Sequence, residues 1–218
     1  MRLLLIRHGE TAHNAEQLAL GQEDVPLNER GRLQAQAVAE ELGGASGAQD
    51  IAAVYSSPLQ RAVATATPLA TALGLTVQIE PGLIEMDVGE VEGISLPQVR
   101  ERYPDFLRDW FSDGLADVPM PGGESLGHVQ ERAWAALEAI RDRHPEETVV
   151  AVSHNFVILT LLCRVLALPL AQFRRLRHEL AAVSILELTA EREVLLALND
   201  RCHLRSESLA SGPSWRRG

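Results

Sequence analysis

The sequence predicts a single α/β domain in which helices cover both faces of a mostly parallel central sheet, giving three layers. Short apolar runs of strand length recur along the chain, and amphipathic stretches of helix length lie between them. The runs are apolar almost throughout, which is typical of parallel strands that are covered on both faces. A chain of 218 residues that is 46% hydrophobic can bury one substantial core. We therefore expect one domain over residues 1–204.

The predicted strands are the apolar runs that are too short to form a helix. Four of them are expected to build the sheet, and two more flank a short polar turn near the end of the chain. That pattern is typical of an antiparallel hairpin, which we place at one side of the sheet. The predicted sheet strands are residues 3–6, 51–55, 76–79 and 148–152, and the hairpin strands are residues 183–188 and 194–198.

The predicted helices span residues 29–42, 58–73 and 125–143, where apolar residues recur at helical spacing. Residues 93–123 form an expected insertion, which is rich in Pro and Gly and carries several aromatic residues. We interpret it as a short lid or as a helical hairpin packed on the domain, and the two interpretations are compatible. Residues 205–218 mix Ser, Gly, Pro and Arg and are expected to form a flexible tail.

Composition excludes several classes of function. The formal net charge of −10 argues against binding to nucleic acid or to an anionic membrane, because both need a basic surface. All 20 basic residues are Arg, so a P-loop lysine, a lysine Schiff base and a serine–lysine dyad are excluded. The two cysteines lack zinc-site spacing, and the first apolar run is too short for a signal peptide or a membrane span. We expect a cytoplasmic protein without a metal site.

Polar clusters follow three of the predicted strands directly. They are Arg7-His8, Ser56-Ser57-Pro58 and Ser153-His154-Asn155. Ligands gather at the carboxyl ends of strands in such sheets, so we expect these clusters to share one crevice. Ser57 is expected to cap a helix that begins at Pro58, which places Arg61 in its first turn. Asn155 is likewise expected to cap a helix that begins at Phe156.

The convergence of two arginines and two histidines favours phosphate chemistry. Phosphoryl transfer needs in-line placement and positive donors around the equatorial oxygens, and Arg and His supply these without a metal. Imidazole can also serve as the nucleophile, because one ring nitrogen can attack while the other donates a hydrogen bond. Neighbouring Arg charges should lower the pKa of His8 and keep its ring neutral.

Short motifs follow one another in order from residue 3 to about residue 160. They comprise residues 5–11 with Asn14, residues 26–31 with Gln34, residues 56–62 with Thr65, residues 83–85 with Gly89, and residues 121–125 and 152–154. Together they resemble the motifs of the histidine phosphatase superfamily, the phosphoglycerate-mutase-like proteins. The resemblance implies a phosphatase that needs no cofactor and acts on a small phosphorylated metabolite.

The resemblance also implies the roles of the site residues. His8 would be the nucleophile that forms a phosphohistidine, and Arg7, Arg61 and His154 would surround the phosphoryl oxygens. Glu85 would protonate the leaving oxygen, and burial together with the phosphate dianion should raise its pKa toward neutrality.

Asn14 and Asn155 complete the expected substrate-binding set. Asn155 stands where the family commonly has Gly, and His13 stands where it commonly has an aromatic residue, so both departures concern specificity. Glu92 is the alternative acid. His128, His144, His178 and His203 lie outside the motifs and receive no role.

Two other functions are compatible with the same fold. A phosphoglycerate mutase would use His8 in the same way but would return the phosphoryl group to another oxygen of the product, and hydrolysis is preferred because the insertion carries few basic residues. A binding protein that has lost catalysis would lack the nucleophile or the acid, whereas this chain keeps both.

Overall fold

The computed structural model describes residues 1–44, 50–112 and 114–204, so the predicted tail lies outside the described residues. The described strands form one six-stranded sheet in the order β3-β2-β4-β1-β5-β6. The first four strands in this order pair in parallel, and β5 runs antiparallel to both β1 and β6. The strands are β1 (Arg2–Arg7), β2 (Ile51–Ser56), β3 (Val77–Ile79), β4 (Thr148–Ser153), β5 (Val183–Leu188) and β6 (Glu193–Asp200). The predicted fold class and the hairpin at one side of the sheet are confirmed.

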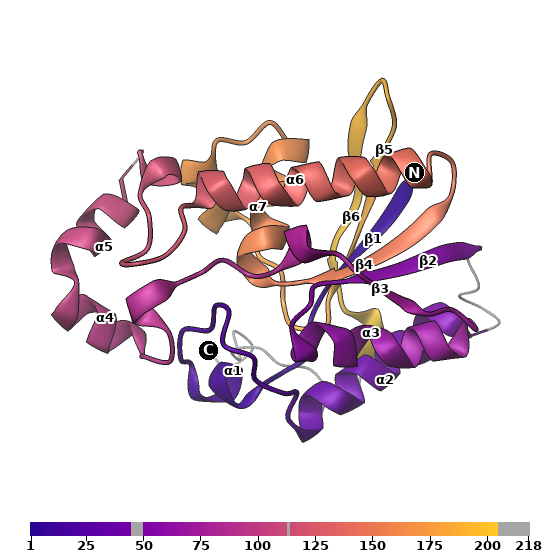
Figure 1. Cartoon of the computed structure of the whole chain (residues 1–218), viewed down its shortest axis with the longest axis horizontal. Coiled ribbons are helices and arrows are strands. Elements are labelled where there is room, and N and C mark those ends of the chain that lie inside the picture. Colours follow the sequence, from indigo (N-terminus) through magenta and orange to yellow (C-terminus); the bar gives the residue numbers. More distant parts are fainter. Residues whose placement is uncertain (45–49, 113, 205–218) are drawn as a thin grey trace, which may run out of the picture.

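Helices cover both faces of the sheet (Figure 1). On one face lie α2 (Glu29–Gly43) and α3 (Gln60–Ala72), and on the other lie α6 (Leu126–Arg143) and α7 (Asn155–Val165). The remaining described helices are short. They are α1 (Ala12–Glu16), α4 (Leu96–Arg102), α5 (Pro104–Trp110) and the 3-10 helices Pro81–Leu83, Gly89–Val91, Leu115–Asp117, Leu170–Arg175 and Cys202–Leu204.

Strand β1 shows why its sequence is apolar throughout. Successive side chains of a strand point to opposite faces. Leu3 and Leu5 therefore enter the core beneath α6 and α7, while Leu4 and Ile6 enter the core beneath α2 and α3. All four side chains are completely buried. Strand β1 thus contributes side chains to both cores, and the next residue, His8, lies just beyond the carboxyl end of the strand.

The insertion folds as two short helices, α4 and α5, followed by a 3-10 turn. Trp110 at the end of α5 packs edge-on against Phe156 of α7 and against Phe173, with ring centroids 6.3 and 6.2 Å apart. The insertion thus packs on the body of the domain through its aromatic residues. Its movement as a lid stays a prediction.

Two predicted helix caps are wrong. Helix α3 begins at Gln60 with Leu59 as its cap, and the Ser57 hydroxyl accepts from the N–H of Leu59 at 3.3 Å while it also lies 2.7 Å from Nε2 of His154. Helix α7 begins at Asn155 and is capped by His154. Both differences move the start of a helix by one or two residues, and Arg61 still lies in the first turn of α3.

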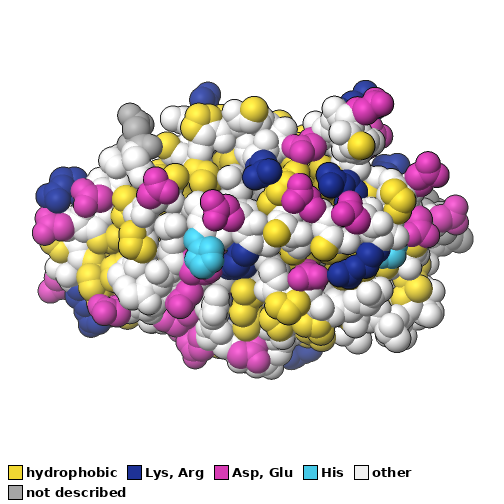
Figure 2. Space-filling model, turned by 45° about the horizontal axis from the view of Figure 1, so that its top comes forward, with side chains coloured by type: hydrophobic (Ala, Val, Ile, Leu, Met, Phe, Trp, Pro, Cys, Tyr) yellow, Lys and Arg dark blue, Asp and Glu magenta, His cyan; other side chains and the backbone are white. Residues whose placement is uncertain are grey.

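The surface agrees with the acidic composition. On the face shown in Figure 2, acidic side chains are spread across the surface and basic ones lie among them rather than in one patch. Within the described residues, no helix is long and apolar enough to cross a membrane.

Candidate active site

Strand register brings the two predicted catalytic histidines together. Parallel strands β1 and β4 end at the paired residues Arg7 and Ser153, and the backbone N–H of His8 donates to the carbonyl of Ser153 at 3.0 Å. His8 and His154 therefore leave the sheet side by side, with ring centroids 5.1 Å apart. Arg61 approaches them from the first turn of α3, which follows the neighbouring strand β2.

The His8 ring is held by a hydrogen bond to the backbone. Its ring is buried, and Nδ1 lies 2.7 Å from the carbonyl oxygen of Gly9. Because a carbonyl only accepts, Nδ1 carries the proton of the neutral ring and Nε2 keeps its lone pair. Burial lowers the pKa of His8 well below 6.5, and the charges of Arg61 and Arg7 lower it further. The ring is therefore neutral at physiological pH, as the sequence analysis expected.

The two arginines are fixed by backbone carbonyls. Arg7 donates from Nη1 to the carbonyl of His178 at 2.7 Å, and Arg61 donates to the carbonyls of Glu23 and Gly21 at 2.7 and 2.5 Å. Neither guanidinium forms an ion pair within the described part of the chain. The Nε atoms of both are buried without a described partner. Two fixed cations that lack carboxylate partners can attract an anion such as phosphate.

His154 faces the same centre. It is completely buried, and its Nε2 lies 2.7 Å from the hydroxyl oxygen of Ser57. Burial, followed by the nearby His8 and the charges of Arg61 and Arg7, lowers its pKa well below 6.5. Its Nδ1 is buried and has no partner among the described residues. With Ser57 donating to Nε2, the His154 Nδ1–H is free to donate to a phosphoryl oxygen.

Glu85 lies in an environment that raises its pKa. Its side chain is buried, Oε1 accepts from the N–H of Met86 at 2.8 Å, and Oε2 accepts from the N–H of Phe156 at 3.3 Å. Burial raises the pKa of Glu85 despite these hydrogen bonds and the charges of Arg61 and Arg7. A raised pKa keeps a larger fraction of the carboxyl protonated near neutral pH, which general-acid catalysis requires.

Glu92 has a different environment. Its carboxylate accepts from the backbone N–H groups of Gly21 and Glu23, at 2.6 and 3.2 Å. The carbonyls of these same two residues hold Arg61. Glu92 therefore braces the loop that fixes Arg61, whereas Glu85 is buried and has a raised pKa.

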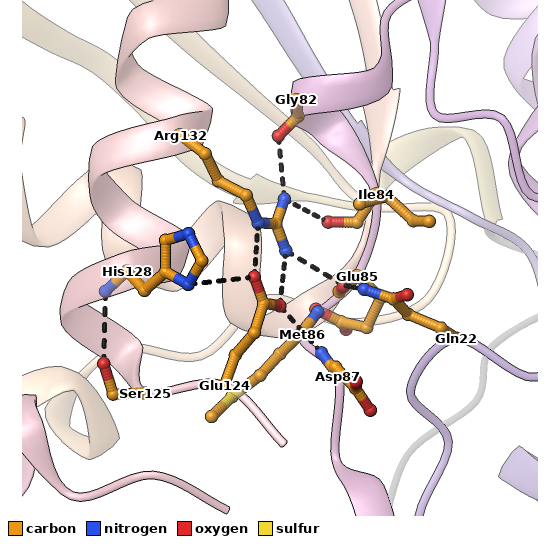
Figure 3. A network of polar contacts seen from close by, with 10 residues as sticks. All are labelled: Gln22, Gly82, Ile84, Glu85, Met86, Asp87, Glu124, Ser125, His128 and Arg132. Carbon is orange, nitrogen blue, oxygen red and sulfur yellow. Dashed lines mark hydrogen bonds and ion pairs between the residues drawn. The ribbon is translucent and has the colours of Figure 1, made fainter. Parts of the chain in front are cut away.

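Arg132 of α6 holds the segment that ends at Glu85, and the sequence analysis missed it (Figure 3). Its guanidinium donates to the carbonyls of Gly82, Ile84 and Glu85 at 2.9, 2.7 and 2.9 Å. It also forms two hydrogen bonds to the carboxylate of Glu124, at 2.9 and 3.0 Å. Three of these five contacts hold the backbone at and before Glu85, and the other two pair Arg132 with the Glu124 carboxylate.

Two further contacts complete this network. Glu124 accepts from the backbone N–H of Asp87 at 2.8 Å, and Gln22 donates from its side chain to the carbonyl of Glu85 at 2.9 Å. Burial works to raise the pKa of Glu124, but the hydrogen bonds from Arg132 and Asp87 and the Arg132 charge outweigh it and lower the pKa. The segment on both sides of Glu85 is thereby fixed in place.

The remaining predicted residues lie around this centre. Asn14 accepts from the N–H of Thr11 at 3.1 Å and closes a capping box on α1, whose cap residue Thr11 lies three residues after His8. Asn155 is the half-buried first residue of α7, and His13 pairs with Glu23 at 3.2 Å. Among the described residues, no group of three His, Cys, Asp or Glu side chains is arranged to hold a metal ion.

Residues 3–201 match the sequence pattern of a family described as the histidine phosphatase superfamily, branch 1. The chain belongs to the histidine phosphatase superfamily. It is 36% identical over 204 residues to phosphoserine phosphatase 1 of Hydrogenobacter thermophilus, and the aligned region covers 94% of each protein. It is also 35% identical over 184 residues to a probable phosphoglycerate mutase, GpmB, of Cronobacter sakazakii, covering 84% of this chain and 83% of the relative.

A solved structure agrees with this assignment. The mycobacterial glucosyl-3-phosphoglycerate phosphatase in complex with VO3 matches with a TM-score of 0.82 and 30% identity, covering 92% of this chain and 99% of that one. The protein is a phosphatase of the histidine phosphatase superfamily, as the motifs predicted.

Proposed function

We propose that this histidine phosphatase hydrolyses small phosphate monoesters in two steps, without a metal ion, through a phosphohistidine at His8. In the first step, Nε2 of His8 forms a bond to phosphorus, the bond from phosphorus to the leaving oxygen breaks, and Glu85 gives that oxygen its proton. In the second step, the Glu85 carboxylate takes a proton from water, the hydroxide forms a bond to phosphorus, and the P–N bond breaks. Inorganic phosphate leaves, and both side chains regain their starting forms.

The hydrogen bond between the His8 Nδ1 and the Gly9 carbonyl carries this proposal, because it directs the Nε2 lone pair away from the backbone. The opposite pKa shifts of His8 and Glu85 support it. A neutral imidazole and a protonated carboxyl are the two forms that the first step consumes, and the lowered pKa of His8 and the raised pKa of Glu85 favour both at once.

The other site residues bind the phosphoryl group in this proposal. Arg7, Arg61 and His154 would donate to its three non-bridging oxygens, which gain negative charge density as the transition state forms. Asn14 and Asn155 would contact the substrate from the first turns of α1 and α7.

Trapping the covalent intermediate tests the proposal. Brief incubation with a ³²P-labelled ester, followed by denaturation, should leave label that is stable to alkali and labile to acid on the peptide containing His8. The His8→Ala variant should lose both the label and turnover. His144→Ala is the matched control, because His144 precedes β4 at the opposite end of the sheet and hydrogen bonds to Tyr55 and Glu147. Normal turnover by His8→Ala, or label on another residue, would contradict the proposal.

The same assay separates hydrolysis from mutase activity, which the similarity to a probable phosphoglycerate mutase raises as the second candidate. A phosphatase releases inorganic phosphate from 3-phosphoglycerate or another ester at the rate at which the ester disappears. A mutase would instead convert 3-phosphoglycerate to its 2-isomer after priming by a bisphosphate, with little release of phosphate.

A further inference from the structure

An apolar pocket of about 290 Å³ lies between the insertion and the body of the domain. Eleven of its twelve lining residues are apolar, and the exception is Gln17. Leu96 and Trp110 reach it from the insertion, whereas Ala19 and Phe156 belong to the body of the domain. No charged side chain lines it within the described part of the chain.

Backbone hydrogen bonds join the insertion to Ala19, which lines the pocket from the body of the domain. The N–H of Ala19 donates to the carbonyl of Ile94 at 3.0 Å, and the N–H of Gly93 donates to the carbonyl of Ala19 at 2.9 Å. The Trp110 ring packs edge-on against Phe156, and both residues line the pocket. The pocket is therefore formed before any ligand binds, which limits the ordering cost of binding.

Phe156 connects the pocket to the acid. Its backbone N–H donates to Oε2 of Glu85 at 3.3 Å, and the residue also lines the pocket. In an in-line displacement the leaving oxygen lies opposite His8, where Glu85 protonates it. With Glu85 as the acid, the carbon chain attached to that oxygen would extend toward Phe156.

We propose that the pocket binds an apolar substituent of the leaving alcohol, so that alkyl or aryl phosphates are the preferred substrates. This inference rests on the proposed phosphohistidine route. A volume near the lower end of small-molecule sites suits a phenyl ring or a short alkyl chain. An ammonium or carboxylate group, such as those of phosphoserine, would lose its hydration there without gaining a charged partner.

A homologous series of n-alkyl phosphates, from methyl to hexyl, tests the proposal in the full-length enzyme. Each methylene that enters the pocket should raise kcat/KM about fourfold, from the transfer free energy of a buried CH₂. Phosphate release is measured for each ester, and phosphoserine is measured alongside. Formation of the phosphohistidine is monitored in the same samples.

Matched leucine variants locate the effect. Leu96 lines the pocket and is 49% exposed, and Leu196 on edge strand β6 is 50% exposed. Leu96→Glu should lower the ratio of hexyl to methyl kcat/KM at least tenfold, while Leu196→Glu should keep the wild-type ratio. Ala19→Leu fills the pocket without adding charge, and it should lower the same ratio even if Leu96→Glu folds poorly.

The outcomes separate this inference from the function on which it rests. A flat alkyl series, or equal ratios in the two leucine variants, with normal phosphohistidine formation at His8 would overturn the pocket assignment alone. Faster hydrolysis of phosphoserine than of hexyl phosphate would do the same. Absence of phosphohistidine with every ester would overturn the proposed function and the pocket assignment together.

Discussion

Replacing Arg132 by Gln should weaken both the fold and the acid step. The Arg132 side chain is 17% exposed and its partner Glu124 is 15% exposed, so the pair is largely but not completely buried. Breaking a buried pair by removing one partner costs about 3–5 kcal/mol, and partial exposure places this pair near the lower limit. We therefore expect a loss of about 3 kcal/mol in the free energy of unfolding, measured by urea denaturation.

The catalytic effect should depend on the leaving group. Without the three carbonyl contacts, the segment 82–85 can shift, and a displacement of about 1 Å at a catalytic group costs roughly 10²-fold. Arg132→Gln should thus lower kcat/KM for alkyl phosphates by about 10–10²-fold, within the range of a partly misplaced general acid. Hydrolysis of p-nitrophenyl phosphate should fall much less, because nitrophenolate leaves without full protonation.

Arg141→Gln is the matched control. Arg141 lies on the same helix, is 27% exposed and pairs with the adjacent Asp142 at 3.5 Å, far along the helix from the carbonyls that Arg132 holds. It should change neither the leaving-group dependence nor the pH profile. Equal losses on alkyl and nitrophenyl phosphates in Arg132→Gln, with an unchanged alkaline limb, would show that Arg132 supports the fold and not the acid.

Three further outcomes are expected. Glu85→Gln should slow alkyl phosphates severely and p-nitrophenyl phosphate mildly; the wild-type rate should fall as pH rises through the raised pKa of Glu85, and this limb should flatten in the variant. Arg61→Ala should lower kcat roughly 10²–10³-fold, as for the loss of an aligned transition-state donor, and a change below about threefold would contradict its role. Burial and then the Arg7 charge lower the pKa of His178 to about 3, so its contribution to stability should be present above its unfolded pKa and be lost as pH falls toward 3. The free energy of unfolding, measured by urea denaturation, should therefore fall between pH 8 and pH 5 by about 2 kcal/mol less in His178→Gln than in the wild type. His128→Gln is the control and should behave like the wild type, because the His128 side chain is 64% exposed.

The pattern of apolar residues was sufficient to predict the sheet and its covering helices. A strand that is buried on both faces needs an apolar side chain at almost every position, and such a run is visible in the sequence. Leu3 to Ile6 are apolar for this reason, and each enters one of the two cores. The caps were harder to predict. Ser57 has the residue type of a helix cap, but its hydroxyl contacts His154, 97 positions further along the chain, and no local pattern encodes that contact.

The same limit applies to the residues that support the site. The motifs identified Glu85 but could not distinguish it physically from Glu92, since only the folded chain shows that the first is buried and the second braces a loop. Arg132 stands in an amphipathic helix like other arginines of that segment. Its partners are backbone carbonyls, which every residue possesses, so sequence alone gives no signal for them.

The cap and first turn of α7 contain residues that contact His8, Glu85 and the apolar pocket, which are the three parts of the proposed mechanism. His154 caps this helix and faces His8, and the N–H of Phe156, two residues later, holds the acid. Phe156 also lines the apolar pocket, and its ring packs on Trp110 of the insertion. A backbone hydrogen bond survives substitution of the side chain, so residue 156 can change the shape of the pocket while the acid keeps its N–H donor. Under the proposed mechanism, a substitution at residue 156 should therefore alter the leaving-group preference without removing the hydrogen bond to Glu85.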